Sequence, residues 1–242
     1  MATTFSKVSD VKSYIAFFDL DHTITGEISG NILAREAYKK GLMSHLDILH
    51  ALWLLFLYKI SLRDPVKIIN EMAAWVKDVP ETVFNKLSVE ISKNVLIPAI
   101  YPEAIREIKM HKKNGAGTVI LSSTPAFIGR EMAKALDMDD IICSELEVNN
   151  GFLTGRSIGP LCFGEEKAVR MKKYCELKNC TAKDSWFYGD SIADFPALLI
   201  AGNPVCINPD SKLKKKAIAK GWKMYYWSKK APGPAEAWPA PL

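Results

Sequence analysis

The chain has 242 residues, of which 48% are apolar and 24% are charged. This length and composition exclude a disordered chain and fit one globular domain, or one domain with a modest insertion. Lys7, Asp10 and Lys12 interrupt the first stretch, which therefore does not resemble a secretory signal. The five cysteines, an odd count without paired spacing, do not suit a disulfide framework, and we expect a reduced, cytoplasmic protein.

Short β-branched or aromatic runs alternate with amphipathic stretches along much of the chain. The runs predict buried strands at 14–18, 118–121, 186–188, 205–207 and 223–227. The stretches between them predict helices at 102–113, 125–136, 165–177 and 195–201. This alternation predicts parallel βαβ units with right-handed crossovers. Asn150-Gly151, between two short apolar segments, predicts a β-hairpin outside this pattern.

The segment from 27 to 96 contains no convincing strand and interrupts the alternation. Its periodicity predicts helices at 31–40, 45–60, 64–76 and 81–92. The run "ALWLLFLY", at 51–58, is apolar on every side but too short for a membrane span, which needs roughly 20 residues. We expect a buried helix of a small bundle there, with a membrane-contacting or substrate-lining face as the alternative.

Four acids follow the ends of predicted strands. Asp19 and Asp21 follow the first strand, and Asp190 and Asp194 follow the strand at 186–188. In open α/β sheets the carboxyl ends of the strands carry the ligand site, so these acids should lie near one another. Close carboxylates are tolerable where a divalent cation lies between them, and Mg²⁺ prefers carboxylate, water and phosphate oxygens.

Hydroxyl and amino groups in the same predicted region suit a phosphate. Ser122, Ser123 and Thr124 end the second strand just before a helix, where hydroxyls and backbone N–H groups are free to bind an anion. Lys167 begins a helix after a glycine-containing loop and could reach the same place. Gly189 allows a sharp turn and a close approach beside Asp190.

The ordered motifs "DLDHT", "LSST", "GEEK" and "GDSIADF" resemble those of the haloacid dehalogenase (HAD) superfamily of phosphohydrolases. The helical insertion after the first motif is similar to the cap of its subfamily IB, the phosphoserine-phosphatase-like branch. The resemblance implies a three-layer α/β Rossmann-like core at 1–26 and 97–242 and an α-helical cap domain at 27–96. It covers nearly the whole chain.

The resemblance also implies roles for the acids of the first and last motifs. Asp19 would be the nucleophile that forms an aspartyl-phosphate, and Asp21 would be the general acid and base. Mg²⁺ would bind the Asp19 carboxylate, the Asp21 backbone carbonyl and Asp190. Asp194 would support the metal waters or Lys167.

Ser122 and Lys167, by the same resemblance, would hold the phosphoryl oxygens and offset their charge. The hydroxyl of Thr23 would brace the nucleophile loop. Ser123 is a further candidate for phosphate contact, although a helix cap is the alternative for it.

The substrate side is less defined. Glu27 and Arg63 are the candidates for binding an amino-acid substrate, as in phosphoserine phosphatases. Glu27 lies one residue short of the spacing of that branch, and the second motif lacks a Gly-Gly pair after its serine. The apolar cap, with Trp53, Phe56 and Trp75, also permits a bulkier or lipid-like phosphomonoester as the substrate.

We therefore expect a Mg²⁺-dependent phosphatase acting on a small phosphorylated metabolite such as phosphoserine or histidinol phosphate. A phospholipid-headgroup or lipid phosphate phosphatase is the alternative. A third hypothesis is a non-catalytic adaptor, because eight lysines and no acids lie between 211 and 230. We expect no nucleic-acid partner, and the sequence leaves the oligomeric state open.

Overall fold

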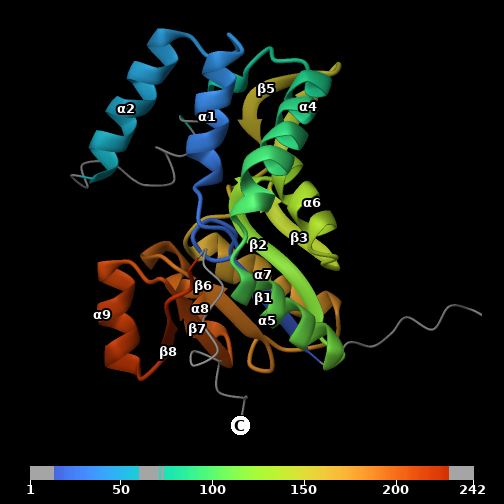
Figure 1. Cartoon of the computed structure of the whole chain (residues 1–242), viewed down its shortest axis with the longest axis vertical. Helices are drawn as coiled ribbons and strands as arrows, with labels where there is room; N and C mark the ends of the chain where they lie inside the picture. Colours follow the sequence, from blue (N-terminus) through green and yellow to red (C-terminus); the bar gives the residue numbers. More distant parts are fainter. Residues whose placement is uncertain (1–13, 60–70, 72–73, 229–242) are drawn as a thin grey trace, which may run out of the picture.

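The computed structural model describes residues 14–59, 71 and 74–228. Its centre is a six-stranded sheet in which all neighbouring strands pair in parallel, in the order β3-β2-β1-β6-β7-β8 (Figure 1). The strands are β1 (Ile15–Phe18), β2 (Gly117–Pro125), β3 (Asp140–Ser144), β6 (Trp186–Gly189), β7 (Asn203–Ile207) and β8 (Lys223–Tyr225). The strand β1 is therefore central, with β2 and β6 on either side.

Helices cover both faces of this sheet. Successive side chains of β1 point to opposite faces, so Phe17 packs into one core and Phe18 into the other. The Phe17 core also contains residues of α7 (Glu165–Leu177), α8 (Phe195–Ile200) and α9 (Ser211–Lys220). The Phe18 core contains residues of α5 (Pro102–Lys113) and α6 (Ala126–Ala135). The predicted three-layer α/β fold is confirmed.

The predicted core elements agree with the structure, with one exception. The five predicted strands and four predicted helices are present, with ends shifted by a few residues at most except for β2, which runs on to Pro125. The strand β3 was not predicted. It lies at the edge of the sheet and begins at the exposed Asp140, so its sequence does not read as a continuous buried run.

Helices fill the segment between β1 and β2, as predicted. They are α1 (Ser29–Lys39), α2 (His45–Lys59), α4 (Glu81–Ile91) and the short helical turns η1 (Ala74–Val76), η2 (Ser92–Leu96) and η3 (Ile97–Ala99). No strand lies among the described residues of this segment. Most of the predicted helix 64–76 falls outside the described residues.

The predicted hairpin forms from β4 (Leu146–Asn149) and β5 (Phe152–Ser157) and packs against the inserted helices. The backbone N–H of Asp78 donates to the carbonyl of Leu153 at 2.8 Å, and Pro80 forms a bridge with Phe152. Figure 1 shows β5 beside α4, above the central sheet. The hairpin and the inserted helices thus form one layer over the carboxyl end of β1.

The helix α2 differs from its prediction. Leu54 is buried, but Trp53 is 55% exposed, and Leu46 and Leu49 are also exposed. The prediction of a buried helix is therefore met at Leu54 and wrong at Trp53, because α2 lies at the outer side of the inserted helices (Figure 1). Among the described residues, no helix is long and apolar enough to cross a membrane.

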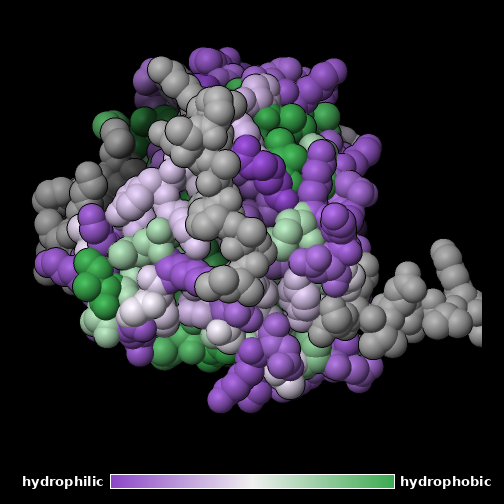
Figure 2. Space-filling view, turned by 60° about the horizontal axis from the view of Figure 1, so that its bottom comes forward, coloured by the Kyte–Doolittle hydropathy of each residue, from purple (hydrophilic) through white to green (hydrophobic). Residues whose placement is uncertain are grey.

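The described part of the lysine-rich segment contains α9 and β8. Three of its lysines lie over neighbouring aromatic rings: Lys214 over Tyr226, Lys216 over Phe195 and Lys220 over Trp222. These contacts give the side chains a local packing role within the fold. On the face drawn in Figure 2, hydrophilic residues dominate and apolar residues form smaller separate patches.

Candidate active site

Asp19 follows the end of β1 and is held in place by the neighbouring strand. Its backbone N–H donates to the carbonyl of Tyr188 in β6 at 2.9 Å, and its side chain is buried. The chain then turns sharply, because the N–H groups of Ile24 and Thr25 both donate to the carbonyl of Leu20. His22 adopts a left-handed backbone conformation within this turn, with φ of 55°.

Lys167 joins two carboxylates in the buried part of the site. Its Nζ lies 2.8 Å from Asp19 Oδ1 and 2.5 Å from Asp194 Oδ1, and the three side chains are at most 8% exposed. Lys167 reaches this position because it lies in the first turn of α7, directly after the loop at Gly164. The sequence prediction that this lysine could reach the strand ends is matched by the geometry.

Asp194 is fixed by the backbone as well as by Lys167. Its Oδ2 accepts hydrogen bonds from the N–H groups of Asp190 and Ser191, each at 3.1 Å. Gly189 makes this possible, because a Cβ there would lie only 2.8 Å from Asp194 Cβ. The expected close approach at Gly189 is therefore present, and both oxygens of Asp194 are occupied.

Three carboxylates could hold a metal ion. Asp19, Asp190 and Asp194 each offer an oxygen, and these atoms all lie within 4.8 Å of one another. Because Asp194 is already hydrogen-bonded at both oxygens, Asp19 and Asp190 are the better ligands. Carboxylate oxygens are the donors that Mg²⁺ prefers, so the residues present fit the predicted ion.

Burial first, and then the charges of neighbouring acids, raise the pKa values of these carboxyl groups. Burial, and then the charges of Asp194 and Asp19, raise the pKa of Asp190 to about 10. Burial and the charge of Asp19 raise the pKa of Asp21 to about 7. Burial would lower the pKa of Lys167, but the charges of Asp19 and Asp194 outweigh it and the pKa is raised. One lysine does not balance four acids, and a bound cation would relieve their repulsion.

The second carboxylate, Asp21, is anchored by a residue that the sequence analysis missed. The backbone N–H of Ser29 donates to Asp21 Oδ1 at 3.0 Å, and Ser29 Oγ donates to Asp21 Oδ2 at 2.9 Å. Ser29 Oγ also lies 2.8 Å from Thr124 Oγ1. The only available signal was that Ser29 lies two residues before the helix predicted at 31–40, which suggests a role near the helix start rather than a contact across the site.

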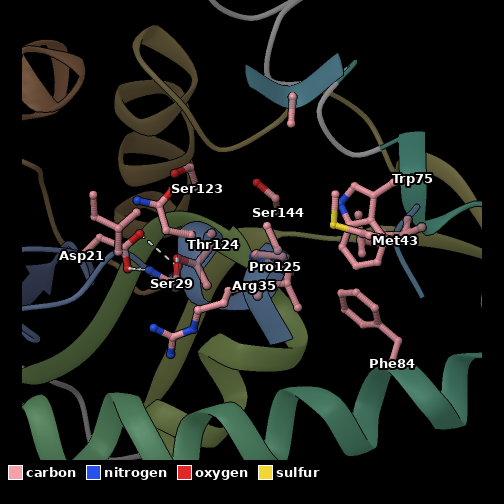
Figure 3. Close-up of a pocket in the computed structure, with 18 of the residues that line it drawn as sticks. Asp21, Ser29, Arg35, Met43, Trp75, Phe84, Ser123, Thr124, Pro125 and Ser144 are labelled. Carbon is pink, nitrogen blue, oxygen red and sulfur yellow. Dashed lines mark hydrogen bonds between the residues drawn. The ribbon is translucent and has the colours of Figure 1, made fainter. Parts of the chain in front are cut away.

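The second motif lies beside these groups. Ser122 is buried, and its hydroxyl forms a hydrogen bond that lowers the pKa of Asp19, although burial outweighs this effect and the pKa is raised. Ser122 Oγ also donates to Thr124 Oγ1 at 3.2 Å. Ser123 is half-buried and lines the cavity that opens beside Asp21 (Figure 3). The structure therefore brings both serines to the site.

That cavity has a volume of about 580 Å³ and lies between the sheet and the inserted helices. Asp21, Ser29, Ser123 and Thr124 line one end, and other lining residues come from α1, α2, η1 and α4. Its size is that of a small-molecule site. Figure 3 shows the hydrogen bonds between Asp21 and Ser29 at this end.

Three further residues were singled out from the sequence: Thr23, Glu27 and Arg63. The buried Oγ1 of Thr23 has no hydrogen-bond partner among the described residues, so the expected bracing of the nucleophile loop is not seen. Glu27 is not among the described residues that line the cavity, and its backbone N–H donates to Thr25 Oγ1 at 3.4 Å. Arg63 lies outside the described residues.

These groups form a site of the phosphoryl-transfer type: a buried carboxylate at a strand end, a second carboxylate beside a cavity, a buried lysine and acids suited to a metal ion. The family model described as haloacid dehalogenase-like hydrolase matches residues 16–199. The chain belongs to this family.

Curated relatives agree with this assignment. A probable phosphatase of Mycobacterium tuberculosis is 27% identical over 221 residues, which cover 88% of this chain and 75% of the relative. A histidinol-phosphatase of Neisseria meningitidis is 27% identical over 213 residues, covering 86% and 96% of the two chains. The family and these relatives confirm the predicted enzyme class, a HAD-type phosphatase.

Solved structures show the same fold. A protein of unknown function from Bordetella pertussis has a TM-score of 0.79 at 24% identity and covers 88% of this chain and 98% of its own. A phosphoserine phosphatase, solved as an analogue of its phospho-aspartyl intermediate, has a TM-score of 0.65 at 19% identity, with 88% and 100% covered. At these identities the likeness concerns the fold.

Proposed function

We propose that this protein is a Mg²⁺-dependent phosphomonoester phosphatase that works through an aspartyl-phosphate at Asp19. The observation that carries the proposal is the buried contact of Lys167 with both Asp19 and Asp194, beside the unpaired carboxylate of Asp190. Among the described residues, no hydrogen bond is seen to the Asp190 carboxylate, which leaves it free to bind a cation. Mg²⁺, when bound by Asp19, Asp190 and the Asp21 carbonyl, supplies positive charge that draws the phosphoryl oxygens to the site.

The residues divide the reaction into two displacements. An oxygen of the Asp19 carboxylate bonds to phosphorus as the ester P–O bond breaks, and Asp21 gives its proton to the leaving oxygen. Water then attacks phosphorus, Asp21 takes a proton from that water, and the bond to Asp19 breaks to release inorganic phosphate. Ser122 and Lys167 hold the phosphoryl oxygens during both steps.

The substrate in this proposal is a small phosphorylated metabolite that binds between the core and a cap formed by residues 27–96. The names of relatives support this class, since they include a histidinol-phosphatase and, at 26% identity over 218 residues, a phosphoserine phosphatase of M. tuberculosis. We also propose a cytoplasmic location, which the five free cysteines support.

Acid-quench trapping tests the intermediate. The full chain with Mg²⁺ and a ³²P-labelled phosphomonoester should retain label that is stable in acid and released by hydroxylamine, as an acyl phosphate is. Asp19→Asn should retain none, and Asp137→Asn, an exposed carboxylate far along the chain, should retain as much as the wild type. Label on the Asp19→Asn variant would contradict the assignment.

A binding measurement tests the metal independently of turnover. Mg²⁺ should raise the melting temperature of the wild-type chain, because a ligand that binds only the folded state stabilises it. The shift should be absent in Asp190→Asn and retained in Asp137→Asn. An equal shift in all three proteins would overturn the proposed metal site.

A further inference from the structure

The cavity beside Asp21 has two chemically different ends. Asp21, Ser29, Ser123 and Thr124 line one end, and Met43, Trp75 and Phe84 line the other (Figure 3). Pro125 and Arg35 lie between the two ends. A phosphoryl group at the polar end would therefore leave its alcohol directed along the cavity toward the apolar end.

Charged groups are scarce along this path. Among the described residues that line the cavity, Asp21 is the only acid and Arg35 is the only base. Asp21 is already held by Ser29, and Arg35 is exposed with its Nε 3.0 Å from Glu36 Oε1. Glu27, a candidate for binding an amino-acid substrate, is not among the described lining residues. A substrate ammonium group would thus find no carboxylate partner along the described wall.

The apolar end favours a different kind of group. Met43 and Phe84 are buried, Trp75 is half-buried, and the apolar Ile48 of α2 also lines the cavity. Apart from the indole N–H of Trp75, these side chains offer water almost no hydrogen bonds, so an apolar group that displaces the water is bound favourably. A desolvated ammonium group without a partner is instead strongly disfavoured.

We propose that the enzyme selects phosphomonoesters whose alcohol carries an uncharged alkyl or aryl group, seated against Met43, Trp75 and Phe84. The proposal rests on the proposed phosphatase function and names the substrate class of that same site. It disfavours zwitterionic substrates such as phosphoserine. The shared chemistry is an apolar alcohol, whether it comes from a lipid-like chain or from an aromatic ring.

Matched substrates test the selection. For ethyl, butyl and hexyl phosphate, kcat/KM should rise by up to about fourfold per added methylene. Hexyl phosphate should exceed 6-aminohexyl phosphate, which differs only by a terminal ammonium group, by about tenfold or more. Phenethyl phosphate, compared with hexyl phosphate, distinguishes an aromatic from an alkyl preference. Equal kcat/KM values for ethyl, butyl and hexyl phosphate would overturn the inference. A higher kcat/KM for 6-aminohexyl phosphate or phosphoserine than for hexyl phosphate would do the same.

Neighbouring residues of α2 provide a matched pair of variants. Ile48 lines the cavity, whereas Leu49 does not and is 62% exposed. Ile48→Asn should reduce the dependence of kcat/KM on chain length, and Leu49→Asn should leave it unchanged. Trp75→Ala gives a second variant in a separate segment, and melting curves check that each protein is folded. If kcat/KM depends on chain length equally in the wild type, Ile48→Asn and Trp75→Ala, these residues do not form the wall that binds the alkyl chain.

The two proposals fail in different ways. If the catalytic assignment is wrong, none of the esters is hydrolysed, ethyl phosphate included. If only the proposed substrate selection is wrong, ethyl phosphate is hydrolysed and the longer esters have no higher kcat/KM.

Discussion

Lys167 and Asp19 form a buried ion pair across the site, with Nζ 2.8 Å from Oδ1 and both side chains at most 8% exposed. Because Asp194 lies on the other side of the same Nζ, this one lysine separates two carboxylates that would otherwise repel each other. The pair links α7 to the end of β1, so it contributes both to the site and to the stability of the fold.

We expect Lys167→Met to lower both the stability of the fold and the activity of the site. Removing one partner of a buried ion pair leaves an uncompensated charge, so the free energy of unfolding should fall by about 3 kcal/mol in the absence of Mg²⁺. Turnover should fall by roughly 10²-fold or more, because a donor to the phosphoryl oxygens is lost. Urea unfolding and phosphate release measure the two effects. Lys172→Met, at an exposed position of the same helix, should change neither.

Asp19→Asn tests the nucleophile in steady-state kinetics. An amide cannot form the aspartyl-phosphate, so kcat for p-nitrophenyl phosphate should fall by at least about 10³-fold. The fold should persist, because the amide keeps the shape of the carboxylate and one hydrogen-bond acceptor for Lys167. Near-normal turnover by a folded Asp19→Asn protein would remove Asp19 from the mechanism, while Asp137→Asn controls for the chemical change alone.

Ser29→Ala separates the general acid from the nucleophile. Without the Ser29 hydroxyl, Asp21 loses one of its two hydrogen bonds to Ser29 and is positioned less firmly. We expect kcat/KM for ethyl phosphate to fall by about tenfold to 10²-fold, since misplacing a catalytic group is costly. The loss should be smaller for p-nitrophenyl phosphate, because nitrophenolate leaves without needing a proton.

The contrast between the two esters is the informative result for Ser29→Ala. An equal loss with both substrates would mean that Ser29 serves the site in some way other than through protonation of the leaving group. Ser157→Ala is a suitable control, because Ser157 is outside the cavity and its hydroxyl donates only to the carbonyl of Gly159 among the described residues.

The core of the fold and half of the site follow from local sequence patterns. The strands β1 and β6 are apolar runs that end in Asp19 and Asp190, and in a parallel sheet the carboxyl ends of neighbouring strands meet. Placing these two acids together therefore requires only strand periodicity and the direction of the sheet. The edge strand β3 was not predicted, because it begins with an exposed acid and its sequence therefore lacks a continuous apolar run.

The other half of the site depends on how the inserted helices lie over the sheet. Ser29 meets Asp21 and Thr124 only because the start of α1 packs against the loop after β1 and the end of β2. No spacing in the sequence encodes the direction of that approach. The exposed face of α2 also depends on how the inserted helices pack. Trp53 belongs to an apolar run, but the position of α2 at the outer side decides which of its side chains are covered.

A prediction away from the active site concerns His111, which is fully buried beneath the sheet. Its Nδ1 lies 2.9 Å from the Tyr14 hydroxyl and its Nε2 lies 2.8 Å from the Tyr188 hydroxyl, which in turn donates to Glu107. These bonds fit a neutral ring that donates from Nε2 and accepts at Nδ1. Burial lowers the pKa of His111 from 6.5 to about 4.

The contribution of His111 to the stability of the protein should therefore fall as the pH falls below about 6.5. Between the two pKa values the unfolded chain binds a proton that the folded chain excludes, so the contribution of His111 to the free energy of unfolding should drop by about 2 kcal/mol from about pH 8 to about pH 5. His111→Gln, which cannot be protonated, should lose this dependence, and the exposed His50→Gln should retain it. The raised pKa values of Glu107, Asp21 and Asp190 act in the opposite direction, since the folded chain holds these protons more tightly, so the effect of His111 is read from the difference between variants. Urea unfolding of the three proteins across this pH range isolates the histidine, and identical pH profiles for His111→Gln and the wild type would show that His111 is not the group responsible.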